Sequence, residues 1–133
     1  MKKGFKQNIE VATKENTDYR RVLYTGEHSQ LVLMSLRPKE EIGLEVHADN
    51  DQFFRFESGH GQVVVNETIY TVSDGDAVIV PAGAAHNISN VSDTEDLKLY
   101  TIYSPAHHMD GTIHATKADE KEEAFDGTTT ENN

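Results

Sequence analysis

The stretch Gly75-Asp-Ala-Val-Ile-Val-Pro-Ala-Gly-Ala-Ala-His-Asn-Ile-Ser-Asn90 contains two short extended segments separated by a turn. Its first part, Ala77-Val-Ile-Val80, is a short β-branched run, and Pro81 and Gly83 end that run with a turn. A second short extended segment then begins at His86. This order of strand, turn and strand is typical of β-structure.

The same alternation of short strands and turn signals continues on both sides of this stretch. No internal segment carries a sustained apolar period of about 3.6 residues, which would indicate a helix. Short strands at regular spacing predict an all-β sandwich or barrel. Strands are expected over residues 19–24, 30–36, 52–56, 62–65, 68–72, 77–80, 86–88 and 97–103.

The two ends of the chain differ from this strand-rich part. Residues 1–18 are predicted to be a polar N-terminal arm, and residues 19–114 the β-barrel domain. The segment from Ala115 to Phe125 is rich in Lys, Glu and Ala, with Thr116 as a candidate N-cap, so one short helix is expected there. The remaining residues have nothing to bury, and 115–133 as a whole is predicted to be a charged helix or tail.

Composition limits the possible partners and cofactors. The chain has 133 residues, enough for one domain, and its 23 acidic side chains exceed its 12 Lys and Arg, for a net charge of −11. Such a surface repels phosphate backbones and anionic lipids, so neither nucleic acid nor a membrane is an expected partner. Cysteine is absent, which excludes disulfides, thiolate metal sites and cysteine nucleophiles. No apolar signal segment follows Met1, so a cytoplasmic location is expected.

Two motifs resemble those of the cupin family. The second matches Gly-x5-Pro-x-Gly-x2-His-x3-Asn at every fixed position. The first keeps the spacing of Gly-x5-His-x-His-x3–4-Glu-x6-Gly, but Lys39 stands in place of glycine, Glu45 in place of the first histidine and Gln52 in place of glutamate. The resemblance covers residues 31–103 and implies a double-stranded β-helix, or jelly-roll barrel. The motifs read Lys39-x5-Glu45-Val-His47-x4-Gln52-x6-Gly59 and Gly75-x5-Pro81-Ala-Gly83-x2-His86-x3-Asn90.

Strand geometry explains how the motif residues can converge. Alternate side chains of a strand share one face, about 6.5 Å apart along the backbone, so Glu45 and His47 point to the same side. Gln52 begins the next strand, and His86 follows the Pro-Ala-Gly turn on a strand across the barrel. Four groups from three strands are therefore expected to face the interior of a closed barrel.

These four residues are the predicted ligands of one divalent transition metal. Glu45, His47 and His86 form a set of two histidines and one carboxylate with open positions, which suits Fe(II) and also Mn(II), Zn(II) or Ni(II). The set carries one negative charge, as does the three-histidine, one-glutamate set usual in the family. Gln52 is the weakest donor, because an amide oxygen is neutral. It either binds the ion or orients a bound water or substrate.

Aromatic residues are the candidates for a substrate pocket. Phe54 and Phe56 alternate with Gln52 and are predicted to face the same way. Tyr100 and Tyr103 lie on the last strand, where a phenol that faces the metal would be a substrate donor or proton shuttle.

The loop that follows this strand contains His107, His108 and His114. It is either plain surface or a cover over the barrel mouth that offers one histidine to the substrate.

Cupins include metal-dependent dioxygenases and isomerases as well as non-catalytic binders, so the fold alone does not decide the function. The leading hypothesis is a metal-dependent enzyme that acts on a small oxygenated metabolite by dioxygenase or sugar-isomerase chemistry. The alternative is a non-catalytic module that binds a small molecule or sugar. Single-domain cupins are often homodimers, and the resemblance implies a homodimer here.

Overall fold

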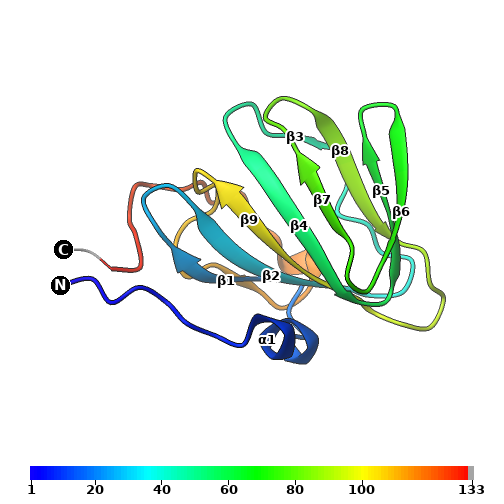
Figure 1. The fold of residues 1–133 in the computed structure, drawn as a ribbon, viewed down its shortest axis with the longest axis horizontal. Coiled ribbons are helices and arrows are strands. Elements are labelled where there is room, and N and C mark those ends of the chain that lie inside the picture. Colours follow the sequence, from blue (N-terminus) through cyan, green and yellow to red (C-terminus); the bar gives the residue numbers. More distant parts are fainter. Residues whose placement is uncertain (132–133) are drawn as a thin grey trace.

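Two antiparallel β-sheets face each other in the computed structural model, which describes residues 1–131 (Figure 1). This architecture confirms the all-β prediction. The larger sheet contains, in spatial order, β10 (Ile113–His114), β1 (Arg20–Thr25), β2 (Gln30–Leu36), β9 (Leu97–Ser104), β4 (Asp51–Ser58) and β7 (Ala77–Val80). The smaller sheet contains β3 (Glu45–Val46), β8 (Ala85–Asn90), β5 (His60–Val65) and β6 (Thr68–Ser73).

Side chains alternate between the interior and the outer faces of the sheets. In β9 the positions of Leu99, Thr101 and Tyr103 are buried, with partly exposed residues between them. Phe54 and Phe56 of β4 are also buried, at 1% and 0% exposure. This period of two is the strand pattern, and it places one apolar core between the sheets.

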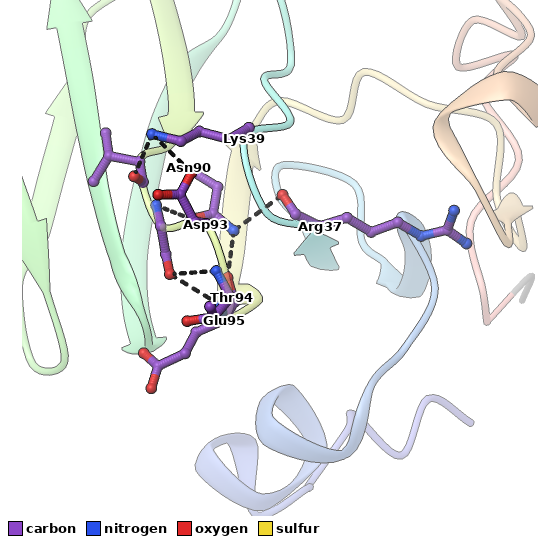
Figure 2. Close-up of polar contacts among 8 residues, drawn as sticks. Arg37, Lys39, Asn90, Asp93, Thr94 and Glu95 are labelled. Carbon is purple, nitrogen blue, oxygen red and sulfur yellow. Dashed lines mark hydrogen bonds and ion pairs between the residues drawn. The ribbon is translucent and has the colours of Figure 1, made fainter.

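Asn90, the last residue of the second motif, joins three chain segments (Figure 2). Its side chain is buried, and its Nδ2 donates to the carbonyl oxygens of Leu36, Arg37 and Glu95 at 3.0, 3.0 and 2.8 Å. The amide nitrogen has two hydrogens and three carbonyl acceptors, so one hydrogen is shared between two carbonyl oxygens. Asn90 therefore holds the end of β2 against the loop between β8 and β9.

Lys39 occupies the family's glycine position in the conformation that favours glycine. Its φ is +64°, in the left-handed region. Its ammonium group donates to the carbonyl of Val91 at 2.9 Å and lies 3.5 Å from the carboxylate of Asp93 (Figure 2). These contacts bind the Lys39 turn to the same loop that Asn90 holds.

The N-terminal segment contains a helix that the sequence analysis did not predict. Helix α1 (Ile9–Glu15) lies inside the predicted arm, and the side chain of Asn8 caps it by accepting from the backbone N–H of Val11 at 3.1 Å. Among residues 1–131 no helix is long and apolar enough to span a membrane.

The C-terminal segment forms less helix and more contacts than expected. Only one 3-10 turn, Lys117–Asp119, forms within the predicted helix. Farther along, the backbone N–H of Thr130 donates to the carbonyl of Thr25 at 2.9 Å, and Glu131 accepts from Tyr24 Oη at 2.6 Å. Thr130 and Glu131 thus lie beside the end of β1. The last two positions of the predicted tail, 132–133, lie outside the described residues.

Candidate metal and ligand site

The four predicted ligands converge between the two sheets. Glu45 of β3 is paired in register with His86 of β8, which places these two side chains on neighbouring strands. His47 follows β3, with its ring centroid 5.3 Å from that of His86 and its Nε2 atom 3.5 Å from Glu45 Oε2. Gln52 lies on β4, opposite Tyr103 of β9.

Hydrogen bonds orient the donor atoms of this group. Gln52 Nε2 donates to Thr101 Oγ1 at 3.1 Å, which leaves the amide oxygen for another partner. His86 Nδ1 lies 3.0 Å from the carbonyl oxygen of Ala84. A carbonyl only accepts, so Nδ1 carries the proton and Nε2 keeps its lone pair.

Two of the four side chains have buried atoms without a hydrogen-bond partner among the described residues. These atoms are His47 Nε2 and Gln52 Oε1. Leaving such an atom unpaired costs about 1–3 kcal/mol, so buried polar atoms normally have a partner. A cation bound between these side chains would supply that partner.

Two cavities lie beside the site. The inner cavity has a volume of about 10 Å³, room for one water-sized particle, and Glu45, Gln52 and His86 are among its lining residues. The outer cavity, of about 350 Å³, is the size of a small-metabolite site. Arg20 and Glu45 line both cavities.

Burial and neighbouring charges keep the imidazole of His47 neutral. Burial, together with the neighbouring His107, His86 and Arg20, lowers the pKa of His47 to about 4. A neutral imidazole is the form that binds a metal. Partial burial raises the pKa of Glu45, while Arg20 acts in the opposite direction.

Three of the four aromatic candidates face the interior. Phe54, Phe56 and Tyr103 are almost completely buried, and Tyr103 contacts the ring of His47 with centroids 5.8 Å apart. Tyr100 has the opposite parity: it is partly exposed and lies 6.2 Å from Phe53, centroid to centroid. The structure therefore does not bring Tyr100 to the site.

The loop after β9 covers one side of the site. The ring of His107 lies 4.2 Å from that of His47, centroid to centroid, and His108 Nε2 lies 3.2 Å from Tyr103 Oη. Burial is the main cause that lowers the pKa values of both histidines. His114 instead lies beside Arg20, with its Nδ1 3.2 Å from Arg20 Nη1. Of the three histidines in this loop, His107 and His108 therefore cover the site, and His114 does not.

Sequence reasoning missed Arg20, the most central charge of the site. Its residue is 3% exposed and it begins β1, outside both motifs. A second arginine follows it directly in the chain. Period-two alternation places only one of this pair inward, which is the one signal that could have indicated a buried cation.

Histidine and carboxylate ligands alone do not complete a metal site. Among residues 1–131, no group of three or more His, Cys, Asp or Glu side chains is arranged to hold a metal ion. These four residue types do not include glutamine, so the amide oxygen of Gln52 stands outside such a group. A metal here therefore depends on Gln52, or on small movements that bring Glu45, His47 and His86 closer together.

Known proteins resemble this chain in sequence and in fold. A family model described as Cupin domain matches residues 32–103, more than half of the chain. The uncharacterized protein YrkC of Bacillus subtilis is 47% identical over 123 residues, which cover 88% of this chain and 66% of YrkC. The uncharacterized protein L612 of Acanthamoeba polyphaga mimivirus is 48% identical over 109 residues, 80% of this chain and 68% of L612. The chain thus spans about two thirds of the length of these two relatives.

A solved structure extends the similarity to three dimensions. The crystal structure of BH2720 from Bacillus halodurans matches with a TM-score of 0.85 and 44% identity. The match covers 88% of this chain and 92% of that one. The strand arrangement of Figure 1 is therefore shared over nearly the whole of both chains.

Proposed function

This chain belongs to the cupin family, and we propose that it is a metal-dependent cupin that acts on a small oxygenated metabolite. The cupin fold supports binding of a small molecule within the barrel. The proposed ligands of one divalent transition metal (Fe, Mn, Zn or Ni) are Glu45, His47, Gln52 and His86. The proposed chemistry is of the dioxygenase or sugar-isomerase type.

The unpaired donor atoms support this proposal most strongly. His47 Nε2 and Gln52 Oε1 are both buried, and the described residues offer neither a hydrogen-bond partner. Two imidazoles, one carboxylate and one amide oxygen form a donor set that suits these ions. A bound ion would supply Lewis-acid polarisation of a ligand oxygen or a site for O₂.

The residues around the proposed ion include a buried neutral phenol and a buried neutral imidazole. Burial raises the pKa of Tyr103, so its phenol keeps its proton at neutral pH. That hydroxyl lies 3.2 Å from His108 Nε2. Because burial holds this imidazole neutral, the pair can hold one proton between a weak acid and a neutral base. A ligand in the outer cavity would meet His108, which lines that cavity, whereas Tyr103 lines the inner one.

The second candidate is a non-catalytic cupin that binds a small molecule or sugar. It is favoured by the absence, within residues 1–131, of three His, Cys, Asp or Glu side chains placed to hold a metal. In that case the four polar side chains contact the ligand directly.

Metal analysis of single variants tests the proposal. We expect His47→Ala and His86→Ala each to lower Mn(II) or Fe(II) content to less than about a tenth of the wild-type value. His60→Ala is the matched control, because His60 is exposed at the start of β5. Thr101→Val removes only the hydroxyl that orients Gln52, and we expect it to weaken metal binding about tenfold.

Activity measurements separate the two candidates. Wild-type protein loaded with Fe(II) or Mn(II) is screened for O₂ uptake and for aldose–ketose exchange. Turnover in the wild type that is lost in both His47→Ala and His86→Ala supports the proposal of an enzyme. Tight ligand binding by calorimetry without turnover on either panel would favour the binder, and full metal content in His86→Ala would contradict the site.

A further inference from the structure

Arg20 is a buried cation where the inner and outer cavities meet. Its side chain is 4% exposed, and the residue lines both cavities. Its guanidinium carbon lies 5.2 Å from the centroid of the Tyr19 ring. Its Nε is buried and has no hydrogen-bond partner among the described residues. A buried charge normally has an anion against it and its N–H groups paired, so an unpaired Nε indicates that one contact is incomplete.

The anion that Arg20 contacts comes from the C-terminal segment. Arg20 Nη1 donates to Glu120 Oε2 at 2.7 Å. The side chain of Glu120 is 38% exposed, although its partner is buried. A carboxylate from the surface therefore reaches into the barrel mouth to meet this arginine.

We propose that Arg20 binds the carboxylate group of a small-molecule ligand, and that Glu120 occupies this position in the ligand-free chain. The inference rests on the proposed function, because it assumes that the barrel binds a small molecule. It adds the chemical class of that ligand, a small carboxylic acid. The planar guanidinium matches a carboxylate with two parallel N–H groups, and the Nη1 donor that Glu120 now contacts is one of that pair.

The charges around the outer cavity favour a carboxylate over a phosphate. Two cations and four carboxylates line this cavity, so exchange of Glu120 for a monoanion leaves the charge at Arg20 unchanged. A dianion would add a negative charge near three remaining carboxylates. The charged lining residues are Arg20, Lys121, Glu45, Glu120, Glu122 and Glu123.

The segment that carries Glu120 is fixed on both sides of it. Before Glu120, Lys117 Nζ donates to the carbonyl of Glu41, and Asp119 closes a capping box with Thr116. After it, the backbone N–H of Met109 donates to Glu123 O at 3.0 Å. Rotation of the exposed Glu120 side chain is therefore enough to free Arg20, and the segment need not unfold.

A titration of the isotope-labelled full chain tests the exchange. The signal is the Nε–H resonance of Arg20, measured after chelation and again with Zn(II). The probes are acetate, neutral acetamide and inorganic phosphate at constant ionic strength. Glu120→Gln removes the competing carboxylate, and we expect it to bind acetate about tenfold more tightly than the wild type. Glu122→Gln removes the same charge from the same cavity without touching Arg20, and we expect less than about a twofold change.

A further variant separates recognition from charge. Arg20→Lys keeps the positive charge but removes the planar guanidinium with its paired N–H groups, and we expect at least about tenfold weaker acetate binding. Because this variant has no arginine Nε–H, binding is monitored by backbone amide shifts, which also report whether the protein is folded. Equal gains in Glu120→Gln and Glu122→Gln, or acetamide binding as tightly as acetate, would overturn the proposal. Tighter binding of phosphate than of acetate would also overturn it. Acetate binding to chelated protein that takes up no metal would support the carboxylate site and contradict only the metal proposal.

Discussion

Two residues of the first motif share a left-handed backbone conformation, but only one of the two positions requires glycine. Lys39 and Gly59 both have positive φ, at +64° and +95°. A side chain is possible at Lys39, and its ammonium contacts with the following loop offset part of the left-handed cost of about 1–2 kcal/mol. At Gly59 a Cβ would lie 2.4 Å from the carbonyl oxygen of Asp96. Glycine is therefore required there by packing as well as by φ.

Substitution at this glycine is the first test at the residue scale. We expect Gly59→Ala to lower the free energy of unfolding by about 3 kcal/mol or more, because the new methyl group meets backbone atoms that cannot rotate away. Gly75→Ala is the matched control: its φ is +92°, but nothing lies within 4 Å of its added Cβ. It should cost only about 1–2 kcal/mol. Urea denaturation of both variants measures the difference, and equal losses would show that the Asp96 contact is unimportant.

At the scale of elements, helix α1 shows what a short segment hides from sequence analysis. It has seven residues, too few for an apolar period to emerge, and only Thr13 among them is buried. Isolated helices of this length are unstable in water, so the helix depends on its contacts with β9, β4 and β2. One such contact is the ammonium of Lys98 on β9, which donates to the carbonyl of Asn16 just after the helix.

The cap of this helix provides the second test. Asn8→Ala removes the acceptor for the Val11 N–H, and we expect a loss of about 1 kcal/mol in unfolding free energy. Asn8→Asp keeps an acceptor in place and should retain nearly full stability. Urea denaturation with α1 amide exchange measures both. If Asn8→Asp lost as much as Asn8→Ala, the side-chain hydrogen bond would not be the cause.

On the scale of the whole molecule, an acidic chain encloses histidines that burial keeps neutral. The net charge is −11, yet the barrel mouth contains His47, His107 and His108, all with lowered pKa values. Burial lowers the pKa of His47 to about 4 and that of His108 to about 2. Folding therefore excludes protons that the unfolded chain would bind at the ordinary value near 6.5.

Stability should accordingly fall in mild acid. The contribution of these histidines is complete above about pH 6.5. It is lost as the pH falls from there towards the folded pKa values, by up to about 1.4 kcal/mol per pH unit for His108, whose pKa is lowered to about 2. Glu45 opposes this trend, because its folded pKa is raised. Urea denaturation of chelated protein at pH 7.5, 6 and 5 measures the slope.

Removal of one buried histidine tests whether histidines cause this dependence of the unfolding free energy on pH. His108→Gln should reduce the loss between pH 6 and 5 by about 1.4 kcal/mol. His28→Gln should leave the loss unchanged, because that side chain is 94% exposed. An unchanged slope in His108→Gln would contradict the assignment.

The amino-acid sequence by itself determined eight of the ten strands that the described residues form, but not the two-residue strands β3 and β10. Period-two alternation and turns that contain proline or glycine are local properties, and together with the spacing of the two motifs they predicted that Glu45, His47, Gln52 and His86 face one interior. Local rules also left questions open, because they do not say which face of a strand is buried. Only the packed sheets decided that Tyr103 faces the site and Tyr100 does not.

The remaining features depend on contacts between residues far apart in the chain. Arg20 and Glu120 are 100 positions apart, and His107 meets His47 from a loop that no strand period describes. The motifs also say nothing of α1 or of the segment that crosses the barrel mouth. Such pairs form only when the sheets close, because burial, not local propensity, selects which charges must find partners. The tertiary structure alone therefore decided that a buried arginine stands beside the predicted ligands.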